Sequence, residues 1–356
     1  MPFDGFTLAD VRERTYKKRD SWWTVYLVDP VASRLVLFTA NRTSVTPDHL
    51  TIAALLLGCA AAFSFGRADV LGLVLGAVVF HISFLLDCMD GKIARLKGNG
   101  TVFGSWLDYV FDRVRVLICT IGLLGGQFAA TGDTVYIWFA LAVVFTDMFR
   151  YLNSPQMAKV RKKMRRAQKA RVRRGLTEAE IEEEAFIRVL GEKRFGELRP
   201  RFLDEAADDA ADDAADAADE GAGGAAHGDG ASRLAYVPEE PPSGSLAERF
   251  PAYARFRDAL LRHRVRPHLF SGIEFQMGVF IVAPLVGAFF PGAMLWVVGA
   301  SCAGLMFFEL FIVGRLWQAS RRYEREAVVL DELVLSAAPE GAGPPEAGRA
   351  GEKAAA

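Results

Sequence analysis

The sequence predicts an all-α membrane protein: a six-transmembrane-helix bundle with an N-terminal interfacial amphipathic helix and a partly disordered cytoplasmic insert. The 356-residue chain is 51% hydrophobic and 24% charged, with a mean hydropathy of +0.17, so apolar and charged residues must be segregated along it. Six apolar stretches are each long enough to cross a bilayer core of about 30 Å. The formal net charge of −1 conceals strongly basic and strongly acidic runs. These features exclude a uniformly soluble globule, a disordered chain and a collagen-like fibre.

The first 45 residues predict a cytoplasmic N-terminus that ends in an interfacial helix. Residues 21–43 are apolar, but Asp29, Pro30 and Arg34 interrupt them. Such a segment is typical of an amphipathic helix that lies in the membrane interface rather than of a seventh span. The alternative is a helix in a soluble core. No apolar core typical of a signal peptide precedes this segment.

Residues 46–153 and 246–318 contain the predicted spans. The short loops on one side of these spans carry a single basic residue, Arg67, whereas the opposite ends are rich in lysine and arginine. The positive-inside rule therefore predicts that both termini and the loop at 88–103 face the cytoplasm. The six predicted spans cover approximately residues 48–66, 69–87, 104–130, 134–153, 273–290 and 292–316.

Charged and low-complexity segments separate the fourth span from the fifth. Residues 154–203 predict a charged cytoplasmic helical insert, whose basic half either contacts anionic lipid headgroups or is simply solvated. Residues 204–245 are rich in Ala, Asp and Gly and predict a disordered linker. Residues 246–270 predict a second interfacial helix, and residues 319–356 a cytoplasmic tail. Nucleic acid is not an expected partner, because no aromatic residues are interleaved with the basic run.

Four aspartates cluster around the loop that joins the second and third spans. Asp87 and Asp90 have i, i+3 spacing, and Asp108 and Asp112 have i, i+4 spacing, so each pair shares one helix face. A short glycine-rich loop joins the two helices, which favours an antiparallel arrangement. We therefore expect the two carboxylate pairs to converge at the cytoplasmic end of the bundle.

Four neighbouring carboxylates repel one another, and divalent cations remove that repulsion. Hard oxygen ligands in this number are typical of Mg²⁺ or Mn²⁺, with a phosphate supplying further oxygens. Lys92, Arg95 and Lys97 follow in sequence and are candidates to hold that phosphate. The residues alone therefore predict metal-assisted chemistry on a phosphate. The alternative is that the aspartates only cap helices and pair with nearby basic residues.

The run from Asp87 to Asp112 has the form D-x2-D-G-x2-A-R-x8-G-x3-D-x3-D. It resembles the motif of the CDP-alcohol phosphotransferases (CDP-alcohol phosphatidyltransferases), which are integral membrane enzymes of phospholipid synthesis. Upstream, the sequence TPDHLT at 46–51 resembles the P-[ND]-x-[IL]-T segment before the first membrane helix of the family, and Asp29-Pro30-Val31 resembles the juxtamembrane helix of actinobacterial members. The resemblance covers about residues 20–153 and, through hydropathy only, 246–317.

The resemblance implies roles for single residues. Two divalent cations, Mg²⁺ or Mn²⁺, would be held by the aspartates, with Asp112 acting as the general base and also contacting the second metal. The remaining contacts would be to the CDP moiety, and at position 48 many family members have Asn instead of Asp. The implied metal ligands are Asp87, Asp90, Asp108 and Asp112, and the implied nucleotide contacts are Gly91, Arg95, Thr101, Asp48 and Thr51.

The resemblance also implies a reaction. A substituted phosphate, expected to be the phosphatidyl group of CDP-diacylglycerol or the corresponding group of another CDP-alcohol, passes to an alcohol acceptor, and CMP is released. Inositol phosphate, glycerol 3-phosphate, serine, phosphatidylglycerol and a soluble polyol phosphate all remain open as acceptors. Membrane lipids as surroundings, a homodimer, a bacterial-type cell membrane and a cytoplasmic active site are further expectations from the resemblance.

Other ionisable residues in the spans need partners, because charge in a membrane is costly. We expect Asp147 to pair with Arg113. Arg115, Arg150 and Glu274 are candidates for the acceptor pocket. The four cysteines show neither a disulfide pattern nor zinc-type spacing and are expected to be small buried side chains.

Two other classes of protein compete with this interpretation. An intramembrane prenyltransferase also places two aspartate-rich motifs on membrane helices, but it separates them widely, whereas here both pairs lie within 26 residues. A non-catalytic transporter or scaffold could use the aspartates as a cation site. Such a site is usually near the bilayer midplane and between inverted repeats, and neither feature is found here.

Overall fold

The computed structural model describes residues 5–177, 181–198, 251–266 and 270–337, and within these ranges it is helical. The described residues form no strand, and the one isolated bridge joins Asp20 to Val265. The all-α fold class is therefore confirmed. The predicted linker at 204–245 lies outside the described residues, as do the tail beyond residue 337 and parts of the insert and the second interfacial segment.

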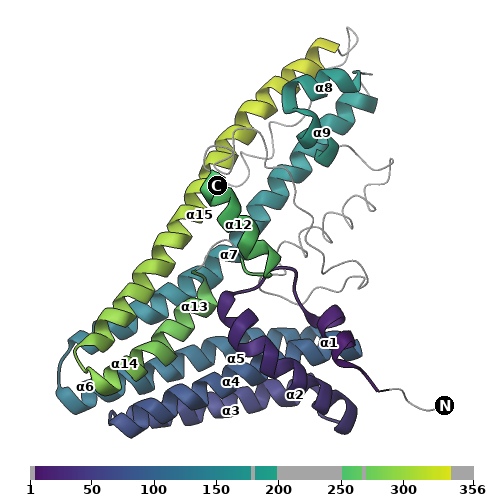
Figure 1. Cartoon of the computed structure of the whole chain (residues 1–356). Helices are drawn as coiled ribbons and strands as arrows, with labels where there is room; N and C mark the ends of the chain where they lie inside the picture. The colour runs from purple at the N-terminus through teal and green to yellow at the C-terminus, as the bar shows by residue number, and fades with distance from the viewer. Residues whose placement is uncertain (1–4, 178–180, 199–250, 267–269, 338–356) are drawn as a thin grey trace. The chain divides into compact units, whose positions relative to one another are not determined.

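Among the described residues, six helices are long and apolar enough to cross a membrane, which confirms the predicted number of spans. Two spans contain a π-helical turn, so each is made of three consecutive elements (Figure 1). The spans are α3 (Pro47–Gly66); α4 (Val70–Lys97); α5 (Val102–Thr120) with η2 (Ile121–Gly125) and α6 (Gly126–Thr131); α7 (Val135–Thr177); α13 (Gly272–Met277) with η3 (Gly278–Val282) and α14 (Ala283–Phe289); and α15 (Ala293–Ala337).

The described chain forms two compact units. The first contains the residues up to Ser154 together with residues 251–311, and the second contains residues 155–198 and 312–337. Helix α7 continues past residue 153, where the predicted span ends, to Thr177, so the first part of the predicted helical insert at 154–203 is helical. The reason is that residues 156–174 are rich in lysine, arginine and alanine, which are good helix formers. The edge of the apolar stretch therefore does not mark the end of the helix.

The first unit is built around α3, α4 and α5, which lie side by side (Figure 1). Small residues allow the close approach: a Cβ placed on Gly126 would lie 2.8 Å from the Cα of Gly66. The Ser83 hydroxyl of α4 donates a 2.6 Å hydrogen bond to the Ala54 carbonyl of α3. These contacts fix the two helices that carry the aspartates relative to α3.

Capping residues set the ends of the helices that carry the site. Thr46 caps α3 in a capping box with His49. Helix α4 ends at Gly98, whose φ of +66° is the left-handed conformation that favours glycine. Thr101 then caps α5 by accepting a 2.8 Å hydrogen bond from the amide of Gly104. The sharp stop and immediate restart bring the two halves of the aspartate motif to the same end of the helix pair.

The N-terminal segment is helical over residues 22–42, which is most of the predicted helix at 21–43. A π-helical turn, η1 (Thr24–Val28), runs directly into α2 (Asp29–Arg42), and α1 (Leu8–Thr15) lies before both. Helix α12 (Pro251–Arg262) ends before residue 270, where the predicted interfacial helix ends, and residues 246–250 of that prediction lie outside the described part of the chain. The residues after α12 join the N-terminal segment through the backbone: Asp20 N donates to Arg264 O at 2.8 Å, and Arg266 N donates to Asp20 O at 3.0 Å.

The second unit has a small apolar core of its own, which the charged composition of the insert did not predict. Helices α8 (Glu183–Leu190) and α9 (Glu192–Leu198) place Phe186 and Phe195 with stacked rings, 6.0 Å apart between centroids. Val172 and Leu330 complete the core with neighbouring leucines. Hence part of the insert packs as folded structure.

Candidate active site

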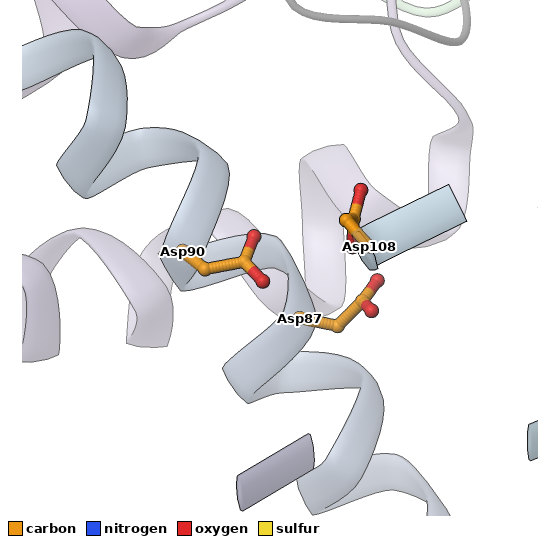
Figure 2. A group of neighbouring side chains, drawn as sticks. All are labelled: Asp87, Asp90 and Asp108. Carbon is orange, nitrogen blue, oxygen red and sulfur yellow. The ribbon is translucent and has the colours of Figure 1, made fainter. Parts of the chain in front are cut away.

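Three carboxylates converge between α4 and α5. Asp87 and Asp90 lie one turn apart on α4, and Asp108 approaches them from α5 (Figure 2). One oxygen from each of the three lies within 4.8 Å of the other two. The convergence expected from the helical spacing is therefore present for three of the four aspartates.

Asp90 is held by a neighbour from α3. The Thr51 hydroxyl donates a 2.6 Å hydrogen bond to Asp90 Oδ2, and both side chains are buried. The Thr51 hydroxyl also lies 3.2 Å from the Pro47 carbonyl oxygen. Thr51 was expected at the nucleotide end, but the structure places it against the carboxylate, where it fixes the direction in which Asp90 points.

Asp112, the fourth aspartate of the motif, is joined to the others through Arg115. The Arg115 guanidinium donates to Asp112 Oδ1 and, at 3.0 Å, to Asp87 Oδ1. Arg115 is almost fully buried, and its side chain passes α3 at Gly58, where an added Cβ would lie 2.8 Å from Arg115 Cγ. Although Asp112 is not among the three carboxylates that meet within 4.8 Å, all four aspartates are close enough to interact electrostatically.

The donor set fits a divalent cation. It consists of carboxylate oxygens, which are the hard ligands that Mg²⁺ and Mn²⁺ prefer. Arg115 pairs with Asp87 and Asp112, and Arg113 lies 3.6 Å from Asp112, so two arginines face four carboxylates and the cluster keeps an excess of negative charge. Asp87, Asp90 and Asp108 are the residues positioned to hold the ion together.

The expected nucleotide contacts lie around this cluster. Asp48 of α3 faces α5 at Gly104, where an added Cβ would lie 2.6 Å from Asp48 Oδ1, so glycine at 104 leaves room for this carboxylate. Gly91 lies beside the Arg95 guanidinium, whose Nη1 would be 3.4 Å from an added Cβ. Arg95 Nε is buried and has no hydrogen-bond partner among the described residues. An unpaired donor next to a glycine fits a phosphate oxygen of a ligand.

Two lysines near the motif differ from expectation. Lys92 Nζ forms a 2.8 Å ion pair with Asp29 Oδ1, and both side chains are almost fully buried, so the prediction that Lys92 holds phosphate is wrong. Lys17, which sequence reasoning missed, interacts electrostatically with Asp20, Arg95 and Asp108. Burial lowers the pKa of the Lys17 ammonium below its ordinary value. The basic stretch around Lys17 was the available signal, but it was read only as a marker of membrane orientation.

The other ionisable residues of the spans are mostly paired. Arg113 forms the predicted ion pair with Asp147, and its guanidinium carbon lies 3.2 Å from the ring centroid of Tyr151. Glu274, an acceptor-pocket candidate, caps α13 by accepting a 2.9 Å hydrogen bond from the Ser271 amide. Arg115, another such candidate, lies among the aspartates.

We predict that Thr51→Val weakens metal binding. Valine has the shape of threonine but cannot donate to Asp90, and loss of such a supporting hydrogen bond typically costs 10–100-fold in metal affinity. When Mn²⁺ is titrated into the protein and monitored by electron paramagnetic resonance, the Kd for Mn²⁺ should be at least about tenfold higher for Thr51→Val than for the wild type. Thr131→Val, at an exposed helix end where the hydroxyl donates only to the Gln127 carbonyl, is the matched control. An unchanged Kd for Thr51→Val would show that this hydrogen bond does not support the site.

Comparisons with known proteins include a match to the segment that contains the aspartate motif. The family model described as CDP-alcohol phosphatidyltransferase matches residues 44–174. An archaetidylinositol phosphate synthase of Methanothermobacter thermautotrophicus is 32% identical over 99 residues, which are 28% of this chain and 49% of that protein. A phosphatidylinositol phosphate synthase of Mycolicibacterium smegmatis is 39% identical over 97 residues, 25% of this chain and 41% of that protein.

The chain therefore spans about half the length, or less, of these curated relatives. The matched residues contain α3, α4 and α5, and with them all four aspartates, Arg95 and Thr101. Three observations agree. The family model matches this segment, the segment contains the complete aspartate motif, and the described residues include six helices of membrane-spanning length. Residues 44–174 are thus similar to the CDP-alcohol phosphatidyltransferase family over the segment that carries the aspartates.

Proposed function

We propose that this protein transfers a phosphatidyl group from CDP-diacylglycerol to an alcohol acceptor and releases CMP. The observation that carries the proposal is the convergence of Asp87, Asp90 and Asp108 within 4.8 Å, inside the segment that matches the family. The buried, unpaired Nε of Arg95 supports a phosphate-bearing ligand next to that cluster. A prenyltransferase or a plain cation site would give no reason for the family match.

In the proposed reaction the acceptor hydroxyl oxygen attacks the β-phosphorus, the bond from that phosphorus to the CMP oxygen breaks, and CMP leaves with the bonding electrons. Divalent cations, two by our proposal, would neutralise the diphosphate and stabilise the leaving CMP when bound at Asp87, Asp90 and Asp108. Asp112 takes the acceptor proton as general base. Arg115 orients Asp112 by donating to Oδ1, and Arg113 lies 3.6 Å from Oδ2, the oxygen proposed to accept the proton.

The remaining contacts position the donor. Arg95 binds a phosphate of the CDP group, and Gly91 leaves room beside it. Thr101 and Asp48 are proposed to line the nucleotide end, where both lie next to Gly104. Because the protein itself does little covalent chemistry in this reaction, this positioning of the donor would supply much of the rate enhancement.

For the acceptor we propose a phosphorylated polyol, with inositol phosphate as the first candidate. The relatives named above are synthases of inositol phosphate lipids. Arg150 and Arg266 are close enough to interact with each other electrostatically, and two neighbouring cations favour a phosphate. Arg150 lies 4.0 Å from Glu309, a distance that leaves its guanidinium weakly engaged.

We further propose that the active site faces the cytoplasm of a bacterial-type membrane, that residues 46–153 and 246–318 form the membrane part, and that the protein works as a homodimer. The basic residues at the motif end of the spans support this orientation.

The test is to incubate the purified full chain with CDP-diacylglycerol, Mg²⁺ and a panel of alcohols, and to measure CMP and lipid products. We expect acceptor-dependent CMP release that is greatest with inositol phosphate and at least tenfold lower with unphosphorylated inositol. Arg150→Gln should raise the KM for the phosphorylated acceptor without changing the KM for CDP-diacylglycerol. If folded protein released no CMP with any alcohol, the proposed activity would be wrong. Equal turnover of phosphorylated and free inositol would contradict only the acceptor assignment.

A further inference from the structure

A second cationic site lies apart from the aspartate cluster. Helices α1 and α2 pack against each other and against α4 (Figure 1). A cavity of about 340 Å³ opens beside them. The lining of this cavity includes the charged and polar residues Arg12, Tyr16, Asp29, Ser33, Arg34 and Arg264. They come from α1, from α2 and from the segment after α12, so three separate parts of the sequence form this site.

Positive charge exceeds negative charge in this cavity. Asp29 is the one acidic residue in the lining, and it already has two partners: Lys92 at 2.8 Å and Arg264 at 3.2 Å. Arg12 and Arg34 add two further positive charges at exposed positions. Arg34 Nη1 donates to the Pro30 carbonyl at 3.0 Å, a neutral acceptor that compensates no charge. An anion is therefore the ligand that this cavity favours.

Contacts with Tyr16 and Lys17 fix the Arg264 side chain at the cavity. Its Nε donates to the Lys17 carbonyl at 3.1 Å, and its guanidinium carbon lies 4.1 Å from the centroid of the Tyr16 ring. Its Nη2 is buried and has no hydrogen-bond partner within the described part of the chain. A buried donor without a partner is costly, and a ligand oxygen in the cavity would remove that cost.

An apolar stripe runs along the same helical segment that contributes Asp29, Ser33 and Arg34 to the cavity. Leu27, Val31, Leu35 and Phe38 recur at helical spacing along η1 and α2, and each is between 39% and 63% exposed. Two residues of the lining, Pro30 and Arg34, directly precede Val31 and Leu35 in the sequence. A free aqueous anion would make no use of such a stripe, whereas a lipid would place its acyl chains on it.

We propose that this cavity binds the phosphate of an anionic phospholipid whose acyl chains lie along the apolar stripe. Arg264 supplies the buried donor, and Arg12 and Arg34 supply charge at the rim. The site is separate from the candidate active site, and binding to it needs no turnover. Failure of this proposal would leave the proposed transferase activity untouched.

The experiment measures lipid binding to the full chain in detergent by native mass spectrometry. The probes are phosphatidylglycerol, phosphatidylcholine and inorganic phosphate, each titrated separately. The test variant is Arg12→Gln/Arg34→Gln, and the matched control is Arg67→Gln/Arg315→Gln, which removes two exposed charges elsewhere. Because Arg12 and Arg34 are exposed, the melting temperature of the test variant should stay close to that of the wild type.

We expect phosphatidylglycerol to bind the wild type and the control equally, and to bind the test variant at least about tenfold more weakly. Phosphatidylcholine and inorganic phosphate should bind all three proteins weakly. Equal affinity of the test and control variants for phosphatidylglycerol would overturn the site. Inorganic phosphate binding as tightly as the lipid, with the same loss in the test variant, would overturn the assignment to a lipid.

Discussion

Asp90→Asn is expected to reduce CMP release by about a thousandfold, and Asp108→Asn by a similar factor. Each substitution removes one negative ligand from a cluster in which three carboxylate oxygens lie within 4.8 Å of one another. Loss of metal-based charge stabilisation in the transition state is worth several kcal/mol, and about 4 kcal/mol corresponds to that factor. The measurement is CMP release from CDP-diacylglycerol under saturating Mg²⁺ and acceptor.

Thermal unfolding separates this effect from misfolding. Neutralising one of several neighbouring carboxylates relieves repulsion, so the variants should melt at or above the wild-type temperature when Mg²⁺ is chelated. Their stabilisation by added Mg²⁺ should be much smaller than that of the wild type. Asp331→Asn, which changes a half-exposed carboxylate paired with Arg171 in the second unit, is the matched control and should retain activity. Activity within a few-fold of wild type for Asp90→Asn would contradict the assignment of the metal site.

The convergence of the aspartates could be predicted because it depends on local rules. Helical spacing places Asp87 and Asp90 on one face, and a glycine-rich loop returns the chain at once, so the two faces must meet. The helix stop at Gly98 and the cap at Thr101 are also local features. Such features require no knowledge of distant partners.

Contacts between distant residues could not be predicted in this way. Nothing in the sequence around Lys92 indicates that it pairs with Asp29, 63 positions earlier, instead of facing a phosphate. Arg115 carried a weak local signal, since it lies three residues after Asp112 on the same helix face. Its second partner, Asp87, becomes apparent only when α4 and α5 are packed together.

Hydropathy likewise located the spans but not the ends of the helices. The predicted fourth span stops at residue 153, whereas α7 continues to Thr177 because its polar residues also favour a helix. The apolar core of the second unit was missed because its members, such as Phe186 and Phe195, are scattered among many charges. A small core of this kind becomes visible only when the helices are assembled.

The buried ion pairs of Arg115 lead to the second large expected effect. Arg115→Met should destabilise the protein by roughly 3–5 kcal/mol, because Asp87 and Asp112 would then be buried without their shared cation. Methionine keeps much of the length of the side chain and its packing beside Gly58. The measurement is thermal or chemical unfolding of purified protein in detergent, with Mg²⁺ chelated and with Mg²⁺ added.

The dependence on Mg²⁺ distinguishes this role from ordinary structural damage. A cation at the aspartate cluster would compensate Asp87 and Asp112, so added Mg²⁺ should stabilise Arg115→Met by more than it stabilises the wild type. Lys92→Met is the matched control: it breaks the comparably buried pair with Asp29, which is not one of the clustered aspartates. It should be destabilised too, but Mg²⁺ should restore no more stability than in the wild type. If added Mg²⁺ stabilised both variants equally, the carboxylates paired with Arg115 would not also interact with the metal. The charge balance proposed for the site would then be wrong.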